Sequence, residues 1–244
     1  MLILSLLHAH AAPGDLAIIR EVMEHRHDRV AEGAPIIGEA DYDKALDGDV
    51  IARLTRVDGV DAAKAWGLAV IDHPVDQVWK VVNNEAALTA HLPVTHSVVL
   101  TGPEHAAPRT VFEFLPLPLL SDRWWVVNVA HNEPLYTRTN GRAWEQVWTD
   151  ATHSTARDDV PAQHQDGIPV AWTQGAWLLV ALPDDRTLLE YYVWTDPGGS
   201  LPAGPATRFA AGAVRDTLRA VDSLCDDALT WADADYRRPD GSAL

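Results

Sequence analysis

The sequence has a single cysteine and few basic residues, and each shortage excludes a class of protein. Cys225 has no partner for an internal disulfide, and it falls on the apolar face of a predicted helix, where a small core residue is expected. Lysine and arginine number 19 against 35 aspartate and glutamate, which leaves a net charge of −16. This charge argues against nucleic acid and against electrostatic docking on anionic lipid.

Long apolar runs and known catalytic motifs are also missing. No stretch is long enough to span a membrane. The chain contains no G-x-S-x-G, no H-E-x-x-H, no phosphate loop and no dinucleotide fingerprint. His25 and His27 point to different faces of a helix, and His153 and His164 are not at a ligand-like spacing. We therefore expect no metal and no other cofactor, and we assign no catalytic residue.

Tryptophan is what the chain has in excess, with ten residues against three phenylalanines. Two interpretations stay open: ordinary core packing, or an aromatic-lined pocket, because tryptophan combines a large apolar area with a polar N–H. Hydrophobic residues make up 47% of the 244 positions, which is enough for a sizeable core.

The first 12 residues allow two interpretations. Residues 2–7 are almost wholly apolar, and Ala9-His10-Ala11 fits a signal-peptidase site, but no lysine or arginine precedes them. An export signal would place the protein in the periplasm or outside the cell. An ordinary N-terminal extension would leave it in the cytoplasm. Residues 13–40 then form an N-terminal helical segment, in which Asp15 caps a helix that stops at Gly33.

Residues 41–234 read as one α+β domain, followed by a tail at 235–244. A hairpin and a helix that starts after Pro74 come first, and about six consecutive strands follow between residues 95 and 195. From Ala206 to about Ala234 there is no proline, and apolar residues recur at helical spacing. The order predicts a curved antiparallel sheet wrapped around a long C-terminal helix.

Four segments of the chain carry a family resemblance: P-V-D-Q-V-W-K-V-V (74–82), F-L-P-L-P-L-L-S-D-R-W-W-V-V (114–127), T-Q-G-A-W-L-L-V-A-L-P-D-D-R-T-L-L-E-Y (173–191) and T-D-P-G-G-S-L-P (195–202). In their order and spacing they resemble the START lipid-transfer domains, within the wider helix-grip superfamily that includes the birch-pollen allergens. The resemblance covers about residues 45–232. It implies an internal hydrophobic tunnel that is closed by the C-terminal helix and holds one lipid or other apolar molecule.

The resemblance also implies a charged pair inside the tunnel. Arg123 stands in the matching S-D-R position, and Glu113 on the preceding strand is the expected partner. Because an isolated buried charge costs several kcal/mol, an inward arginine needs a carboxylate or a polar ligand head. The alternative interpretation is a salt bridge at the rim, worth under about 1 kcal/mol.

The alternation of strand residues predicts the rest of the lining. Glu190 and Asn128 suit the solvent face, which turns their neighbours inward. We expect Phe209 and Ala213 of the last helix to close the tunnel. The expected ligand-binding residues are Glu113, Arg123, Trp125, Trp148, Trp177, Tyr191, Phe209 and Ala213.

The leading functional hypothesis is a non-catalytic, monomeric carrier for a hydrophobic, lipid-like molecule. The apolar, proline-rich loop 115–120 would move to admit the ligand, which leaves room for transient membrane contact. A first alternative is a cyclase or hydrolase that uses Glu113, Arg123 and Tyr191 on an apolar substrate. A second alternative is a regulatory module whose cavity is filled by its own side chains.

Overall fold

The computed structural model describes residues 14–118, 120–199 and 203–244, with the backbone alone described at 61 and 203–211. The expected signal or extension at 1–12 therefore lies outside the described residues. Among the helices that are described, none combines the length and apolarity needed to cross a bilayer.

Two N-terminal helices precede a hairpin and two further helices, and most of the strands follow before the long last helix. The helices are α1 (Asp15–Glu24), α2 (Glu39–Leu46), α3 (Val75–Val82), α4 (Glu85–Thr89), α5 (Glu133–Arg138) and α6 (Ala203–Ala228). The strands are β1 (Ile51–Val57), β2 (Val60–Ile71), β3 (His96–Thr101), β4 (Arg109–Leu115), β5 (Arg123–His131), β6 (Ala143–Asp150), β7 (Ile168–Pro169), β8 (Trp172–Leu182) and β9 (Arg186–Asp196). Short 3-10 turns lie at Arg26–Asp28, Arg157–Asp159, Ala162–His164 and Asp233–Asp235.

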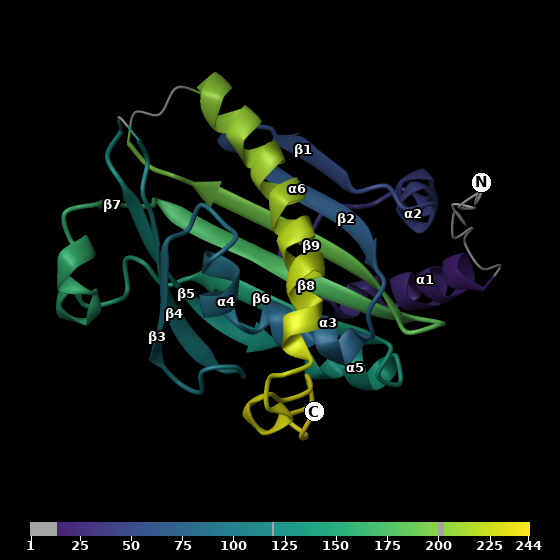
Figure 1. The fold of residues 1–244 in the computed structure, drawn as a ribbon. Helices are drawn as coiled ribbons and strands as arrows, with labels where there is room; N and C mark the ends of the chain where they lie inside the picture. The colour runs from purple at the N-terminus through teal and green to yellow at the C-terminus, as the bar shows by residue number, and fades with distance from the viewer. Residues whose placement is uncertain (1–13, 119, 200–202) are drawn as a thin grey trace, which may run out of the picture.

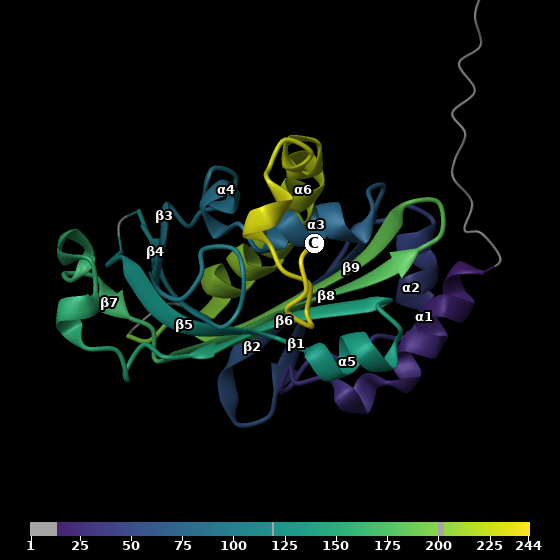
Figure 2. The same cartoon turned by 90° about the horizontal axis from the view of Figure 1, so that it is seen from below.

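Within the described residues, nine strands form one curved sheet. The strand order is β1-β2-β9-β8-β6-β5-β4-β3, all antiparallel, and the short β7 pairs in parallel with β5. Figure 1 shows α6 crossing the sheet diagonally, and Figure 2 shows α3, α4 and α6 together over its concave face. The expected α+β class and the sheet wrapped around a C-terminal helix are confirmed.

The long helix touches the sheet where β2 has no side chain. A Cβ built on Gly67 would lie 2.6 Å from Cγ1 of Val214 and 2.7 Å from Cδ1 of Leu218. Both of these α6 side chains are buried. Close approach of the two backbones therefore depends on glycine at this position.

Helix α3 supports α6 from the side. Val78, Trp79 and Val82 are buried with the α6 residues Val221 and Cys225 in one cluster. The tail after α6 packs on the same helix, since the indole Nε1 of Trp79 donates to the carbonyl oxygen of Arg237 at 2.8 Å. Helix α6 is shorter than predicted: it ends at Ala228, and the next apolar residue, Leu229, is 70% exposed.

The N-terminal segment covers the opposite, convex face of the sheet (Figure 2). Ile19 and Val22 of α1 and Tyr42 of α2 join the sheet residues Leu68 and Leu178 in a second buried cluster. The expected helix to Gly33 is wrong, because α1 ends at Glu24. The chain then extends at Arg29, which brings that side chain onto the sheet.

Arg29 holds two carboxylates that lie on the convex face. Its Nε donates to Glu145 Oε1 and its Nη1 to Glu190 Oε1, both at 2.6 Å. The three side chains are at most 4% exposed. The prediction that Glu190 faces solvent is therefore wrong: alternation found the correct face, but the N-terminal segment covers it.

Removing Arg29 should destabilise the fold strongly. Arg29→Met leaves two buried carboxylates without their cation, which we expect to lower the free energy of unfolding by about 3–5 kcal/mol. Arg20→Met is the matched control, because Arg20 pairs with Glu39 at 2.7 Å on an exposed surface, where solvent screens the pair and its loss should change stability far less. Urea unfolding of both variants measures the difference, and equal small losses would contradict a structural role for the Arg29 cluster.

Candidate ligand-binding cavity

A cavity of about 1110 Å³ lies between α6 and the concave face of the sheet. Its walls come from the β1–β2 hairpin, from α4 and the segment that follows it, from β4, β5, β6, β8 and β9, and from α6. Among the described lining residues, the ones exposed at the surface are Pro93, Leu120, Ala171 and Gly199. We call these four residues the rim.

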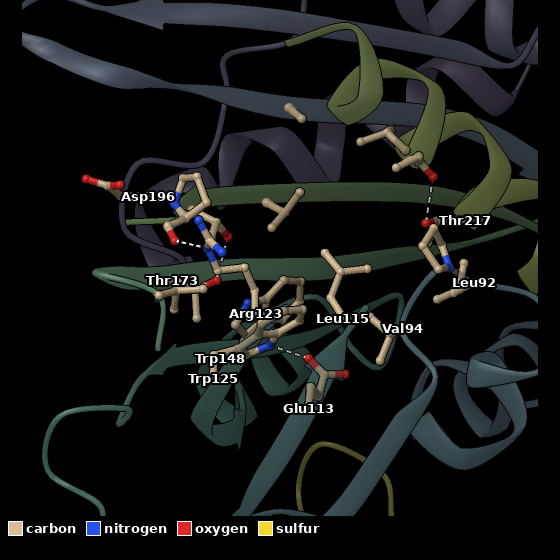
Figure 3. Close-up of a pocket in the computed structure, with 18 of the residues that line it drawn as sticks. Leu92, Val94, Glu113, Leu115, Arg123, Trp125, Trp148, Thr173, Asp196 and Thr217 are labelled. Carbon is tan, nitrogen blue, oxygen red and sulfur yellow. Dashed lines mark hydrogen bonds between the residues drawn. The ribbon is translucent and has the colours of Figure 1, made fainter. Parts of the chain in front are cut away.

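Most of the expected site residues meet in this one space. Figure 3 shows several of the lining side chains converging from different strands and from α6. The side chain of Phe209 lies outside the described residues. The lining includes the other predicted residues, Glu113, Arg123, Trp125, Trp148, Trp177, Tyr191 and Ala213.

Aromatic rings pack against one another on the sheet side of the cavity. Tyr191 of β9 lies between two tryptophans, with its ring centroid 5.9 Å from Trp148 and 4.2 Å from Trp177. Trp177 is opposite Tyr191 in the pairing of β8 with β9, so both side chains stand on the concave face. This part of the wall is a set of mutually supported aromatic faces.

The predicted pair between Glu113 and Arg123 does not form. Glu113 lies directly opposite Trp125 in the pairing of β4 with β5, and Oε2 of Glu113 accepts a hydrogen bond from the Trp125 indole. Arg123 lies two pairs further along, opposite Leu115, and its side chain turns away from Glu113 (Figure 3). The hydrogen-bond partner of Glu113 is therefore the Trp125 indole and not the predicted Arg123.

Arg123 binds backbone carbonyl groups at the end of β9. Its Nε donates to the Pro197 oxygen at 2.7 Å and its Nη2 to the Gly198 oxygen at 3.1 Å, while Nη1 donates to the Ser121 oxygen. The residue is 3% exposed. Among the described residues no carboxylate lies within ion-pair distance of this guanidinium, although the negative charge of the adjacent Asp122 acts on it from further away.

Glu113 is an acid whose charged form is disfavoured. Its side chain lies deep in the molecule, and the surface it retains faces the cavity. Burial, followed by the negative charge of Glu85, raises the pKa of Glu113 from 4.5 to about 7, although the Trp125 hydrogen bond acts in the opposite sense. Burial and the nearby Glu113 also raise the pKa of Tyr191. At neutral pH the carboxyl can therefore donate as well as accept a hydrogen bond.

The sequence interpretation missed two parts of the wall. Leu88 of α4, together with Leu92 and Val94 after it, lines the side opposite the aromatic rings. Their role depends on long-range packing, for which the local sequence carries no signal. Thr173 and Thr195 share a hydrogen bond of 2.7 Å on the lining, and the alternation that places Trp177 inward would also have found Thr173.

The described lining residues include few of the side-chain types that enzymes use in catalysis. In the described lining there is no histidine, cysteine or serine, so acid–base catalysis would depend on the carboxyl groups of Glu85, Glu113 and Asp196 and on the Tyr191 hydroxyl. Nowhere in the described chain do three histidine, cysteine or acidic side chains gather in a metal-binding arrangement.

Comparisons with known proteins agree with the fold. No sequence model of a known family matches the chain, and no curated protein matches it in sequence. In three dimensions it is similar to the STAR-related lipid transfer protein of Xanthomonas axonopodis, with a TM-score of 0.59 and 20% identity over 72% of this chain and 93% of that one. Human STARD10 gives a TM-score of 0.56 and 12% identity, over 83% of this chain and 84% of that one.

Human StAR-related lipid transfer protein 5 gives a TM-score of 0.55 and 14% identity, over 86% of this chain and 94% of that one. At such identities the likeness shows the fold. The chain has the fold of START domains, as its sequence motifs predicted.

Glu113 should make stability depend on pH. Because its folded-state pKa is raised, the folded protein holds this proton more tightly than the unfolded chain does between about pH 4.5 and 7. Its contribution to stability is present below about pH 4.5 and is lost as the pH rises toward 7. This increase in pKa, from 4.5 to about 7, corresponds to a change of roughly 3 kcal/mol in the free energy of unfolding.

Glu113→Gln removes this titration. In urea unfolding across the same pH range, the advantage of the wild type over the variant should fall by up to roughly 3 kcal/mol as the pH rises. Parallel pH profiles for the two proteins would show that Glu113 does not titrate in this window.

Proposed function

We propose that this protein is a monomeric carrier for a hydrophobic, lipid-like small molecule, which it holds in the cavity between α6 and the sheet. The observation that carries the proposal is an apolar-walled space of about 1110 Å³ inside a single domain. Pockets for drug-sized ligands are about 300–1,000 Å³, so this one has room for a larger molecule. A hollow of this size is the opposite of the filled core that a purely regulatory module would have.

Desolvation supplies the binding free energy. Burying about 300 Å² of apolar ligand surface, at about 25 cal/mol per Å², gives about 7 kcal/mol before the freedom lost on binding is subtracted. The lining is mostly aliphatic and aromatic, so little of this gain is lost to unpaired polar groups. The structural neighbours named as lipid transfer proteins support the same ligand class.

Two polar groups would orient the ligand. Arg123 lies beside the rim residue Gly199, with Nη2 3.3 Å from a Cβ built on that glycine. Its guanidinium has no ion-pair partner among the described residues, with only the more distant charge of Asp122 nearby, so it suits an anionic or strongly dipolar head group. Glu113, on the neighbouring strand, suits a hydroxyl or carbonyl group further along the ligand.

The rim is where the ligand would enter, and its chemistry suits brief contact with a membrane. Leu120 is 49% exposed at the rim, and Leu117 of the same proline-rich loop lines the cavity behind it. An exposed leucine beside an apolar cavity can contact acyl chains without the basic patch that a permanent electrostatic attachment needs.

Filling the cavity from α6 tests the proposal. Ala213 lines the cavity, so Ala213→Trp should place an indole in the ligand's space and abolish binding of a fatty acid. Asp216→Trp is the matched control, because Asp216 is exposed on the same helix and should leave binding unchanged. Displacement of an environment-sensitive dye by stearate measures both. Equal binding by the two variants would place the ligand elsewhere.

Arg123 tests the head-group assignment. Because hydrogen bonds to charged groups contribute about 1.5–3 kcal/mol, Arg123→Leu should weaken stearate binding about tenfold and alter binding of a plain alkane far less. Arg123→Lys keeps the charge and should recover part of the stearate affinity. If Arg123→Leu weakens both ligands alike, Arg123 is not a head-group contact.

A further inference from the structure

One row of residues runs across the concave face of the sheet. Strand pairing places Val129 of β5 beside Trp148 of β6, Trp148 beside Gly175 of β8, and Gly175 beside Val193 of β9. The next residue in the row is Ala65 of β2, which pairs with Val193. Every member except Gly175 lines the cavity. This row is the cavity floor, and Gly175 is the gap in it.

The indole of Trp148 fills that gap. A Cβ built on Gly175 would lie 2.0 Å from Cζ2 and 2.5 Å from Cε2 of Trp148, closer than any two such atoms can approach. The indole therefore lies over the backbone of β8. Side chains on a strand normally stand roughly perpendicular to the sheet, and a tryptophan that did so here would project into the cavity.

The lowered indole is held by its neighbours. It stacks on the Tyr191 ring at 30° between planes, and Tyr191 in turn packs on Trp177 at 31°. A ring that rose from this position would lose the stacking and enter the space above it. The depth of the cavity above Trp148 thus depends on glycine, which has no side chain, at position 175.

We propose that Trp148, kept down by Gly175, is the residue that sets how long or bulky a ligand the cavity accepts. The proposal rests on the carrier function proposed above and goes further, because it names the ligand class: long-chain molecules that use the full depth over Trp148. Short-chain molecules fit whether the indole is lowered or raised.

Substitutions at the two positions act in opposite senses. Gly175→Ala forces the indole up, and we expect it to weaken stearate binding about tenfold or more while octanoate binding stays within about twofold. The double variant Gly175→Ala/Trp148→Ala has no indole to raise and should regain stearate binding. Gly212→Ala is the control, because nothing lies within 4 Å of the added Cβ and neither fatty acid should be affected.

Gly175→Ala can also prevent folding, because the added Cβ would lie 2.4 Å from the Tyr192 carbonyl oxygen. Variants of Trp148 alone test the proposal in that case. Trp148→Phe and Trp148→Ala deepen the floor, so the ratio of stearate to octanoate affinity should rise in both. The measurement is displacement of 1-anilinonaphthalene-8-sulfonate from the full-length protein.

The outcomes separate the two proposals. An unchanged affinity ratio in both Trp148 variants overturns the assignment of Trp148 while leaving a carrier in place. Failure of the wild type to bind the dye or either fatty acid overturns the carrier function and this inference together. A raised ratio that is absent from Gly212→Ala establishes Trp148 as the size determinant.

Discussion

The close packing of α6 on Gly67 of β2 determines how the helix lies over the sheet. At this point the sheet contributes no side chain, and Val214 and Leu218 of α6 are buried against the β2 backbone. A helix that packs closely on one part of a curved sheet, here mainly β1 and β2, diverges from the rest of that sheet. The cavity is the space left by that divergence, and its walls are apolar because both surfaces belong to the core.

The two faces of the sheet carry buried charged side chains in different arrangements. On the convex face, Arg29 pairs with Glu145 of β6 and Glu190 of β9 and thereby fastens the N-terminal segment to these two strands. On the concave face, Arg123 and Glu113 face the same cavity without pairing with each other. The ion cluster on the convex face neutralises its own charges, whereas Arg123 and Glu113 take part in hydrogen bonds but in no ion pair among the described residues.

Much of this architecture could be predicted from the sequence, for physical reasons that particular residues show. Period-two alternation identified the strands at 109–115 and 123–131 and turned Trp125, Trp177 and Tyr191 inward. Alternation assigns a side chain to a face of the sheet but does not show what covers that face, so Glu190 was predicted to be exposed although it is buried. Charge complementarity suggested a partner for Glu113, but the choice of Trp125 depends on strand register, as does the role of Gly175.

Native mass spectrometry of the protein purified from its own host shows whether the cavity holds one apolar molecule. We expect one added mass per chain, released by organic extraction and belonging to a lipid-like compound. A bare polypeptide mass, together with no uptake of lipid by the purified protein, would contradict it.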